Sequence, residues 1–198
     1  MRSLKLSLLA TLLAASSGLS LAQSDTTSPA AAASAASAPI QKAQPADPTE
    51  DPMDEQMPPD MPDDDPVMQA AFKKGKATLG KFLPLAKTNK DPKLMVFAVK
   101  VRFEDGKKTE HMWVTPFEQK GMKFSGRLND LPRVIKNKQH EQQVEFTTKE
   151  IVDWMYYDQS QHRMFGNYTT CARLTKGRPK DVADVKRIYG LDCTNNDM

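Results

Sequence analysis

The residues of this chain best suited to catalysis are a histidine, two carboxylates and two tryptophans. His111 directly follows Glu110 and stands two positions before Trp113, and Asp153 stands beside Trp154 later in the chain. A histidine oriented by Asp153 or Glu110 can act as a general base, because imidazole titrates near neutral pH and a carboxylate fixes its tautomer. One interpretation of these residues is therefore a small hydrolase.

The other interpretation gives the same residues structural or ligand-binding roles. The sequence has no Gly-x-Ser-x-Gly elbow, no phosphate-binding glycine loop and no His-x-x-x-His pair. The catalytic candidates are His111, Glu110 and Asp153. The candidates for ligand contacts are Trp113, Trp154 and Arg173, of which Arg173 is also a candidate partner of Asp153. We predict no metal site and no cofactor.

A β-hairpin is predicted to carry His111 and Trp113. Alternating apolar residues run from Met95 to Phe103, and Asp105-Gly106 is a turn signal. With residues 104–106 as a three-residue loop, the predicted facing pairs are Glu110 with Lys100, His111 with Val99, and Trp113 with Phe97. This register directs His111 and Trp113 toward the apolar face.

Helices are predicted at both ends of the folded part, with strands between them. The first helix begins at Pro66 behind an Asp65 cap, and its apolar stripe includes Gly75, which predicts a close backbone approach. Pro84 is expected to end or kink this helix. The last helix spans 179–189 and ends at Gly190.

Further strands are predicted at 122–130, 143–146 and 154–157, a short helical turn at 147–150, and a helical or irregular segment at 163–174. The fold class is α+β, a small, mostly antiparallel sheet packed with an N-terminal and a C-terminal helix.

Composition divides the chain into three parts. Residues 1–22 form a secretory signal peptide, with two basic residues, a short apolar core and a small-residue cleavage site after Ala22. Residues 23–65 form a disordered, acidic, Pro/Ala-rich linker with few apolar residues to bury. Residues 66–198 form the folded domain. No transmembrane segment is predicted, and the mature protein is expected in the periplasm or outside the cell.

Charge follows the same division. Residues 23–65 hold ten acidic residues and one lysine, a net charge of −9, whereas residues 66–198 hold 25 Lys and Arg and 15 Asp and Glu, a net charge of +10. The basic domain suits an anionic partner, either an unknown protein or an anionic envelope component, although the linker could simply shield its own domain. Nucleic acid is not predicted, because no aromatic residues interleave the basic runs. Met53, Met57 and Met61 leave a copper-binding linker as a weaker third interpretation.

The two cysteines, Cys171 and Cys193, are predicted to form a disulfide, because an exported protein meets an oxidising environment. The bond would tie the C-terminal helix to the body of the domain.

Five segments in fixed order resemble one bacterial family. They are MQAAFKKGKATLGKF, VKVRF followed by EHMWV, FSGRLNDLP, IVDWMYY and GNYTTCARL, and together they are similar to the YegJ-like domain-of-unknown-function family (number 2314) over about residues 66–175. The resemblance implies a small α+β domain, often exported, and carries over no activity, cofactor or catalytic residue. Cys171 departs from the family pattern.

The function expected is an exported, non-catalytic binding module, such as a toxin-binding immunity protein, with the hydrolase as the alternative.

Overall fold

The computed structural model describes residues 57–58 and 60–198. The predicted signal peptide, its cleavage site and the linker up to residue 56 lie outside the described residues. No helix in the described part of the chain is long and apolar enough to cross a membrane.

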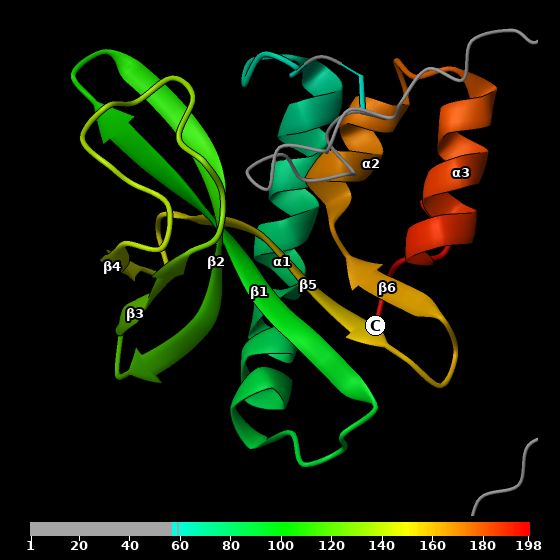
Figure 1. Ribbon diagram of the computed structural model, residues 1–198, viewed down its shortest axis with the longest axis horizontal. Coiled ribbons are helices and arrows are strands. Elements are labelled where there is room, and N and C mark those ends of the chain that lie inside the picture. The colour runs from blue at the N-terminus through cyan, green and yellow to red at the C-terminus, as the bar shows by residue number, and fades with distance from the viewer. Residues whose placement is uncertain (1–56, 59) are drawn as a thin grey trace, which may run out of the picture. The chain divides into compact units, whose positions relative to one another are not determined.

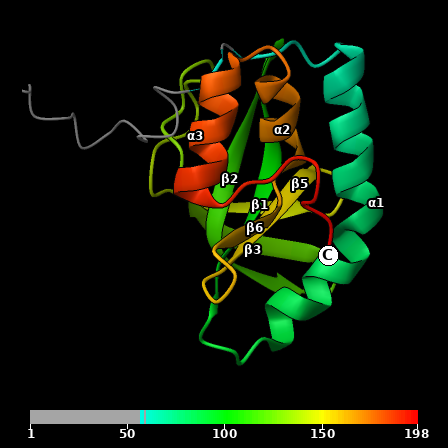
Figure 2. The ribbon, with the colours of Figure 1, turned by 90° about the vertical axis from the view of Figure 1, so that its right-hand side faces the viewer.

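Six antiparallel strands form one sheet in the order β4-β3-β2-β1-β5-β6 (Figure 1). The strands are β1 (Leu94–Asp105), β2 (Lys108–Lys120), β3 (Lys123–Leu128), β4 (Gln143–Thr147), β5 (Ile151–Asp158) and β6 (Arg163–Gly166). The helices are α1 (Pro66–Thr88), α2 (Tyr168–Leu174) and α3 (Pro179–Tyr189). Figure 2 shows the three helices side by side with most of the sheet behind them. The predicted α+β class is confirmed.

Helix α1 begins where its sequence predicts, but Pro84 does not end it. The Asp65 side chain caps it by accepting a hydrogen bond from Val67 N at 2.8 Å, and the helix continues through Pro84 to Thr88. Its buried face includes Gly75, where a Cβ atom would lie 2.5 Å from the backbone oxygen of Val152. The predicted close approach is therefore real, and it places α1 directly on β5.

The predicted hairpin register is wrong. The loop between β1 and β2 contains two residues, Gly106 and Lys107, and Asp105 pairs with Lys108. Gly106 has φ 63°, the conformation that a two-residue hairpin of this kind requires. The observed facing pairs are Val99 with Val114, Lys100 with Trp113, Val101 with Met112, Arg102 with His111, and Phe103 with Glu110.

The register change also reverses the faces of β2. Relative to the prediction, each residue of β2 pairs three positions further along β1, and an odd shift exchanges the two faces of a strand. Met112 and Val114 are buried in the core, and His111 and Trp113 lie only partly buried beside Arg102 and Lys100. The expectation that His111 and Trp113 point toward the apolar face is contradicted.

The remaining elements agree with the predictions except at two places. Strands β3 and β4, the strand through Trp154, and a final helix ending at Gly190 with φ 70° are confirmed. Glu150 Oε2 accepts a hydrogen bond from Thr147 N, as a capping box predicts, but Thr147 Oγ1 donates to Glu150 Oε2 instead of accepting from the Glu150 N–H. The predicted helical turn is a turn that leads into β5. Residues 163–166 form strand β6, and the helical part of that segment begins only at Tyr168.

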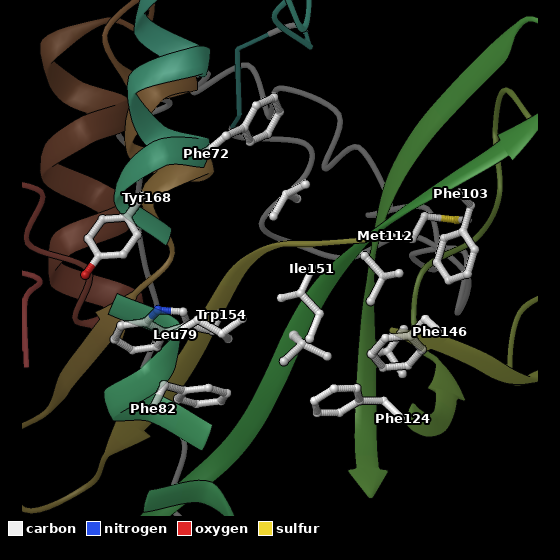
Figure 3. Packing of buried hydrophobic residues seen from close by; sticks show 14 of the residues in the cluster. Phe72, Leu79, Phe82, Phe103, Met112, Phe124, Phe146, Ile151, Trp154 and Tyr168 are labelled. Atoms are coloured by element: carbon white, nitrogen blue, oxygen red, sulfur yellow. The ribbon is translucent and has the colours of Figure 1, made fainter. Parts of the chain in front are cut away.

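The main core lies between α1 and the sheet (Figure 3). Trp154 is 0% exposed and stacks on Phe82 with ring centroids 4.8 Å apart, and Phe124 stacks on Phe146 at 5.5 Å. A second, smaller cluster of Met164, Leu174, Val185 and Leu191 lies under α3. Beside it, the disulfide Cys171–Cys193 joins α2 to the C-terminal tail, as predicted.

Candidate functional site

A pocket of about 830 Å³ lies between the N-terminal half of α1, strand β2, the loop 129–134 and α2. Lys100 of β1, His111 and Trp113 of β2, and Thr169 and Arg173 of α2 line it. These residues come from three elements, and α2 is distant in the sequence from β1 and β2, so the pocket exists only in the folded domain. Its lining combines cationic, aromatic and hydroxyl side chains with the carboxylates of Asp60, Asp63, Glu110 and Asp130. The cationic groups could hold an anionic ligand where these carboxylates leave them accessible.

Lys100 is the most buried cation of the pocket. Lys100 is 9% exposed. Its Nζ lies 3.2 Å from Thr169 Oγ1 and 4.8 Å from the centre of the Trp113 ring. Burial lowers the pKa of Lys100, an effect that the nearby carboxylates of Asp130 and Asp153 oppose. The amine is thus held by an aromatic face and a hydroxyl group, with two carboxylates nearby.

Asp153 positions α2 against Lys100. It is fully buried, and its Oδ2 accepts hydrogen bonds from the backbone N and the Oγ1 of Thr169, each at 2.8 Å. Asn167, at the start of α2, makes no side-chain capping bond, so this carboxylate from β5 satisfies a free N–H group of the helix. Burial raises the pKa of Asp153, and the Thr169 hydrogen bonds and Lys100 oppose that rise.

His111 lies against a carboxylate that the sequence did not single out. Its Nδ1 is 3.4 Å from Oδ1 of Asp63, and its ring centroid is 4.9 Å from that of Phe72. Burial lowers the pKa of His111, and Asp63 opposes this shift. Asp153, which the sequence suggests as a partner of His111, accepts hydrogen bonds from Thr169 instead. The carboxylate beside His111 is that of Asp63.

Glu110 fixes the loop at the edge of the pocket. Its two carboxylate oxygens accept hydrogen bonds from the backbone N–H groups of Arg133, Val134 and Ile135 at 2.8 to 3.0 Å. Glu110 faces Phe103 across the ladder, not Lys100 as predicted. These contacts hold residues 133–135 beside the pocket wall.

The last residues before α1 cross the pocket. We call residues 57–58 and 60–65 the acidic strap. Arg173 donates from Nε and Nη2 to the backbone oxygen of Pro58 at 3.2 and 2.7 Å, and its Nη1 lies 3.4 Å from Oδ1 of Asp60. Arg173 therefore holds the strap, whereas the sequence suggested it as a partner of Asp153; the cation directly opposite Asp153 is Lys100.

Methionines attach the strap to both hydrophobic clusters. Met61 packs against the main core, and Met57 packs against the cluster under α3. Met53, the third methionine of the copper interpretation, lies outside the described residues. Among the residues that the structure describes, no group of three or more His, Cys, Asp or Glu side chains is placed to hold a metal ion.

The two tryptophans have different surroundings. Trp154 is enclosed in the core, where its Nε1 donates to Thr78 Oγ1 at 2.9 Å. Trp113 lines the pocket, and its backbone N donates to Asp130 Oδ2 at 2.8 Å. Trp113 is thus the tryptophan placed to touch a ligand.

Sequence reasoning missed Lys100 and Thr169 as pocket residues; the one available signal was a lysine inside an apolar strand.

The fold and the pocket define a small α+β domain with a buried lysine in a polar cavity. Residues 65–192 match the family described as "Uncharacterized protein conserved in bacteria (DUF2314)", and the chain belongs to this family. It is also similar to "Uncharacterized protein YegJ" of Escherichia coli (strain K12), with 30% identity over 124 residues that make up 63% of this chain and 77% of that protein. No solved structure gives a significant match. The resemblance seen in the sequence is confirmed.

Proposed function

We propose that this chain is an exported, non-catalytic binding protein that holds an anionic group of a cell-envelope partner in the pocket around Lys100. The N-terminal leader pattern supports export, and the net charge of +10 over residues 66–198 supports an anionic partner. The disulfide agrees with an oxidising compartment.

The observation that carries the proposal is the burial of two cationic side chains and a histidine around one cavity. Lys100 is 9% exposed as a residue, and the side chains of Arg173 and His111 are 14% and 15% exposed. Burying a cation is unfavourable unless anionic or hydrogen-bonding groups compensate it. Side chains held in this way present fixed donors to a ligand, and an anion entering the cavity would meet them with little rearrangement.

The hydrolase remains the second candidate, because His111 lies in the pocket with the carboxylate of Asp63 at 3.4 Å. Glu110 and Asp153, which were its expected partners, are engaged by backbone N–H groups instead. Its test is hydrolysis of p-nitrophenyl ester and phosphate substrates by the wild-type protein and by His111→Asn. Turnover that disappears in His111→Asn would favour the hydrolase over the binding protein.

Binding is tested on the full mature chain with three probes: inorganic phosphate, phosphatidylglycerol vesicles and an acidic peptide. Isothermal titration measures affinity, and the Trp113 indole N–H signal in NMR spectra reports whether the pocket is the site. Arg173→Gln is expected to weaken binding about tenfold or more, because it removes a charge-assisted hydrogen-bond donor.

Arg187→Gln is the matched control, since it removes the same charge from a side chain that is 70% exposed on α3 and does not line the pocket. Equal weakening by the two substitutions would show a diffuse attraction to the basic surface and would refute the pocket.

A further inference from the structure

We propose that the acidic strap is a built-in competitor for the pocket, and that the partner ligand is an acidic peptide segment that replaces it. This inference deepens the proposed function and rests on it. The strap shows what kind of ligand the pocket accepts, because it is an acidic peptide already bound there.

The strap makes the contacts expected of a bound extended peptide. One carboxylate, Asp60, meets Arg173, a second, Asp63, meets His111, and the backbone oxygen of Pro58 accepts two hydrogen bonds from Arg173. Met61 adds an apolar anchor on the main core. Charge, main-chain hydrogen bonds and an apolar side chain together distinguish a peptide ligand from a simple anion.

The two sides of this contact differ in burial. The receiving side chains of Arg173 and His111 are 14% and 15% exposed, whereas those of Asp60 and Asp63 are 76% and 46% exposed. Arg173 and His111 therefore belong to the built part of the domain, and the carboxylates lie over them from outside. Ion pairs with exposed partners contribute little to stability, so another peptide with the same chemistry can displace the strap.

Covalent attachment explains how such weak contacts can still regulate access. The strap leads directly into α1 at Pro66, so its local concentration at the pocket is high without any partner present. A free peptide binds only the fraction of molecules whose strap is released, and its apparent affinity falls by that fraction. The strap would thus exclude weak anions and admit a partner segment that binds better.

The experiment measures binding of a fluorescent peptide with the sequence of residues 57–65 to the full mature chain by anisotropy. The variant Asp60→Asn/Asp63→Asn keeps the strap but removes both carboxylates that meet the pocket. It is expected to bind the peptide about tenfold more tightly than the wild type if the wild-type strap occupies the pocket nine-tenths of the time. Thermal melting checks that the variant folds as the wild type does.

The matched control is Asp51→Asn/Asp54→Asn, which removes the same charge from positions outside the described residues. Unchanged affinity in the control with tighter binding by the strap variant supports the proposal. Equal affinity of all three proteins for the peptide refutes the competitor. If the strap variant binds phosphate or phosphatidylglycerol vesicles through the pocket but not the peptide, the acidic-peptide ligand is wrong and the proposed function stands. Failure of every probe to bind the strap variant refutes both.

Discussion

Lys100 and Asp153 lie directly opposite each other on β1 and β5, and both are buried. Thr169 connects them, because its hydroxyl contacts Lys100 Nζ at 3.2 Å and Asp153 Oδ2 at 2.8 Å. This arrangement ties α2 to the centre of the sheet. It also places the Lys100 amine at the pocket wall. Without Lys100, the buried carboxylate of Asp153 would lose its opposing charge.

The first prediction concerns this buried pair. Asp153→Ala is expected to lower the free energy of unfolding by roughly 3–5 kcal/mol, because Lys100 loses its opposing charge and the Thr169 N–H loses its acceptor. Urea unfolding with the disulfide intact measures the change. The double variant Asp153→Ala/Lys100→Met should lose less than the sum of the two single variants, since the residues are coupled.

Glu104→Ala provides the control for this pair. Its side chain is 62% exposed on the same sheet, so the free energy of unfolding should change by no more than about 0.5 kcal/mol. Additive losses from Asp153 and Lys100, or a loss from Asp153→Ala as small as that from Glu104→Ala, would contradict the coupling.

Two glycines of α1 make a matched second prediction. Gly75→Ala should destabilise the domain by roughly 1–3 kcal/mol, because the added Cβ meets the backbone oxygen of Val152 at 2.5 Å and α1 must move away from β5. Gly80→Ala should stabilise it by up to about 1 kcal/mol, because nothing lies within 4 Å of its Cβ position and alanine favours helix. Thermal and urea unfolding of both variants check the opposite signs, and the same sign for both would contradict the close packing.

The helices could be predicted because their signals are local. The Asp65 cap, the apolar stripe of α1 and the Gly190 terminus each depend on residues a few positions apart. The hairpin is present as predicted, but its register depends on both the length and the position of the loop, which spans residues 106–107 rather than 104–106. The alternation of Met112 and Val114 with Val99 and Val101 would have indicated the observed register, in which four apolar residues share one face.

The candidate site could be predicted only in part, because its contacts are formed by distant segments. His111 and Trp113 were recognised by residue type, and both line the pocket. Composition predicts that Asp63 lies in a linker, and it does not reveal that Arg173 and His111, more than 40 residues away, hold this segment. The hairpin pattern predicts that Lys100 faces Glu110, and only the β1–β5 pairing places Asp153 opposite it.

The third prediction is a pH dependence of stability that arises from His111. Burial lowers the pKa of this histidine in the folded state below its ordinary 6.5, so between the two pKa values the unfolded chain binds more protons. The free energy of unfolding should therefore rise with pH up to about 6.5 and then lose this contribution to the slope. His111→Asn should flatten the slope, as urea unfolding at a series of pH values can measure.

His140→Asn serves as the control, because it removes an imidazole whose side chain is 43% exposed. It is expected to keep the wild-type slope below pH 6.5. A slope that survives in His111→Asn would assign the effect to other groups and remove the evidence that His111 is buried as an uncharged residue.

The fourth prediction concerns the disulfide between Cys171 and Cys193, which are 22 positions apart. Cys171→Ser/Cys193→Ser should lower the free energy of unfolding by roughly 3 kcal/mol, because the unfolded chain regains the freedom of the opened loop. Reducing the wild-type protein should produce the same loss, and adding reductant to the variant should produce none. Hydrogen exchange should increase most in α3 and the tail, where the cluster around Val185 depends on the bond to hold residues 191–193 against α2. If exchange instead rises equally in β1 and β5, the disulfide stabilises the whole domain rather than its C-terminal part.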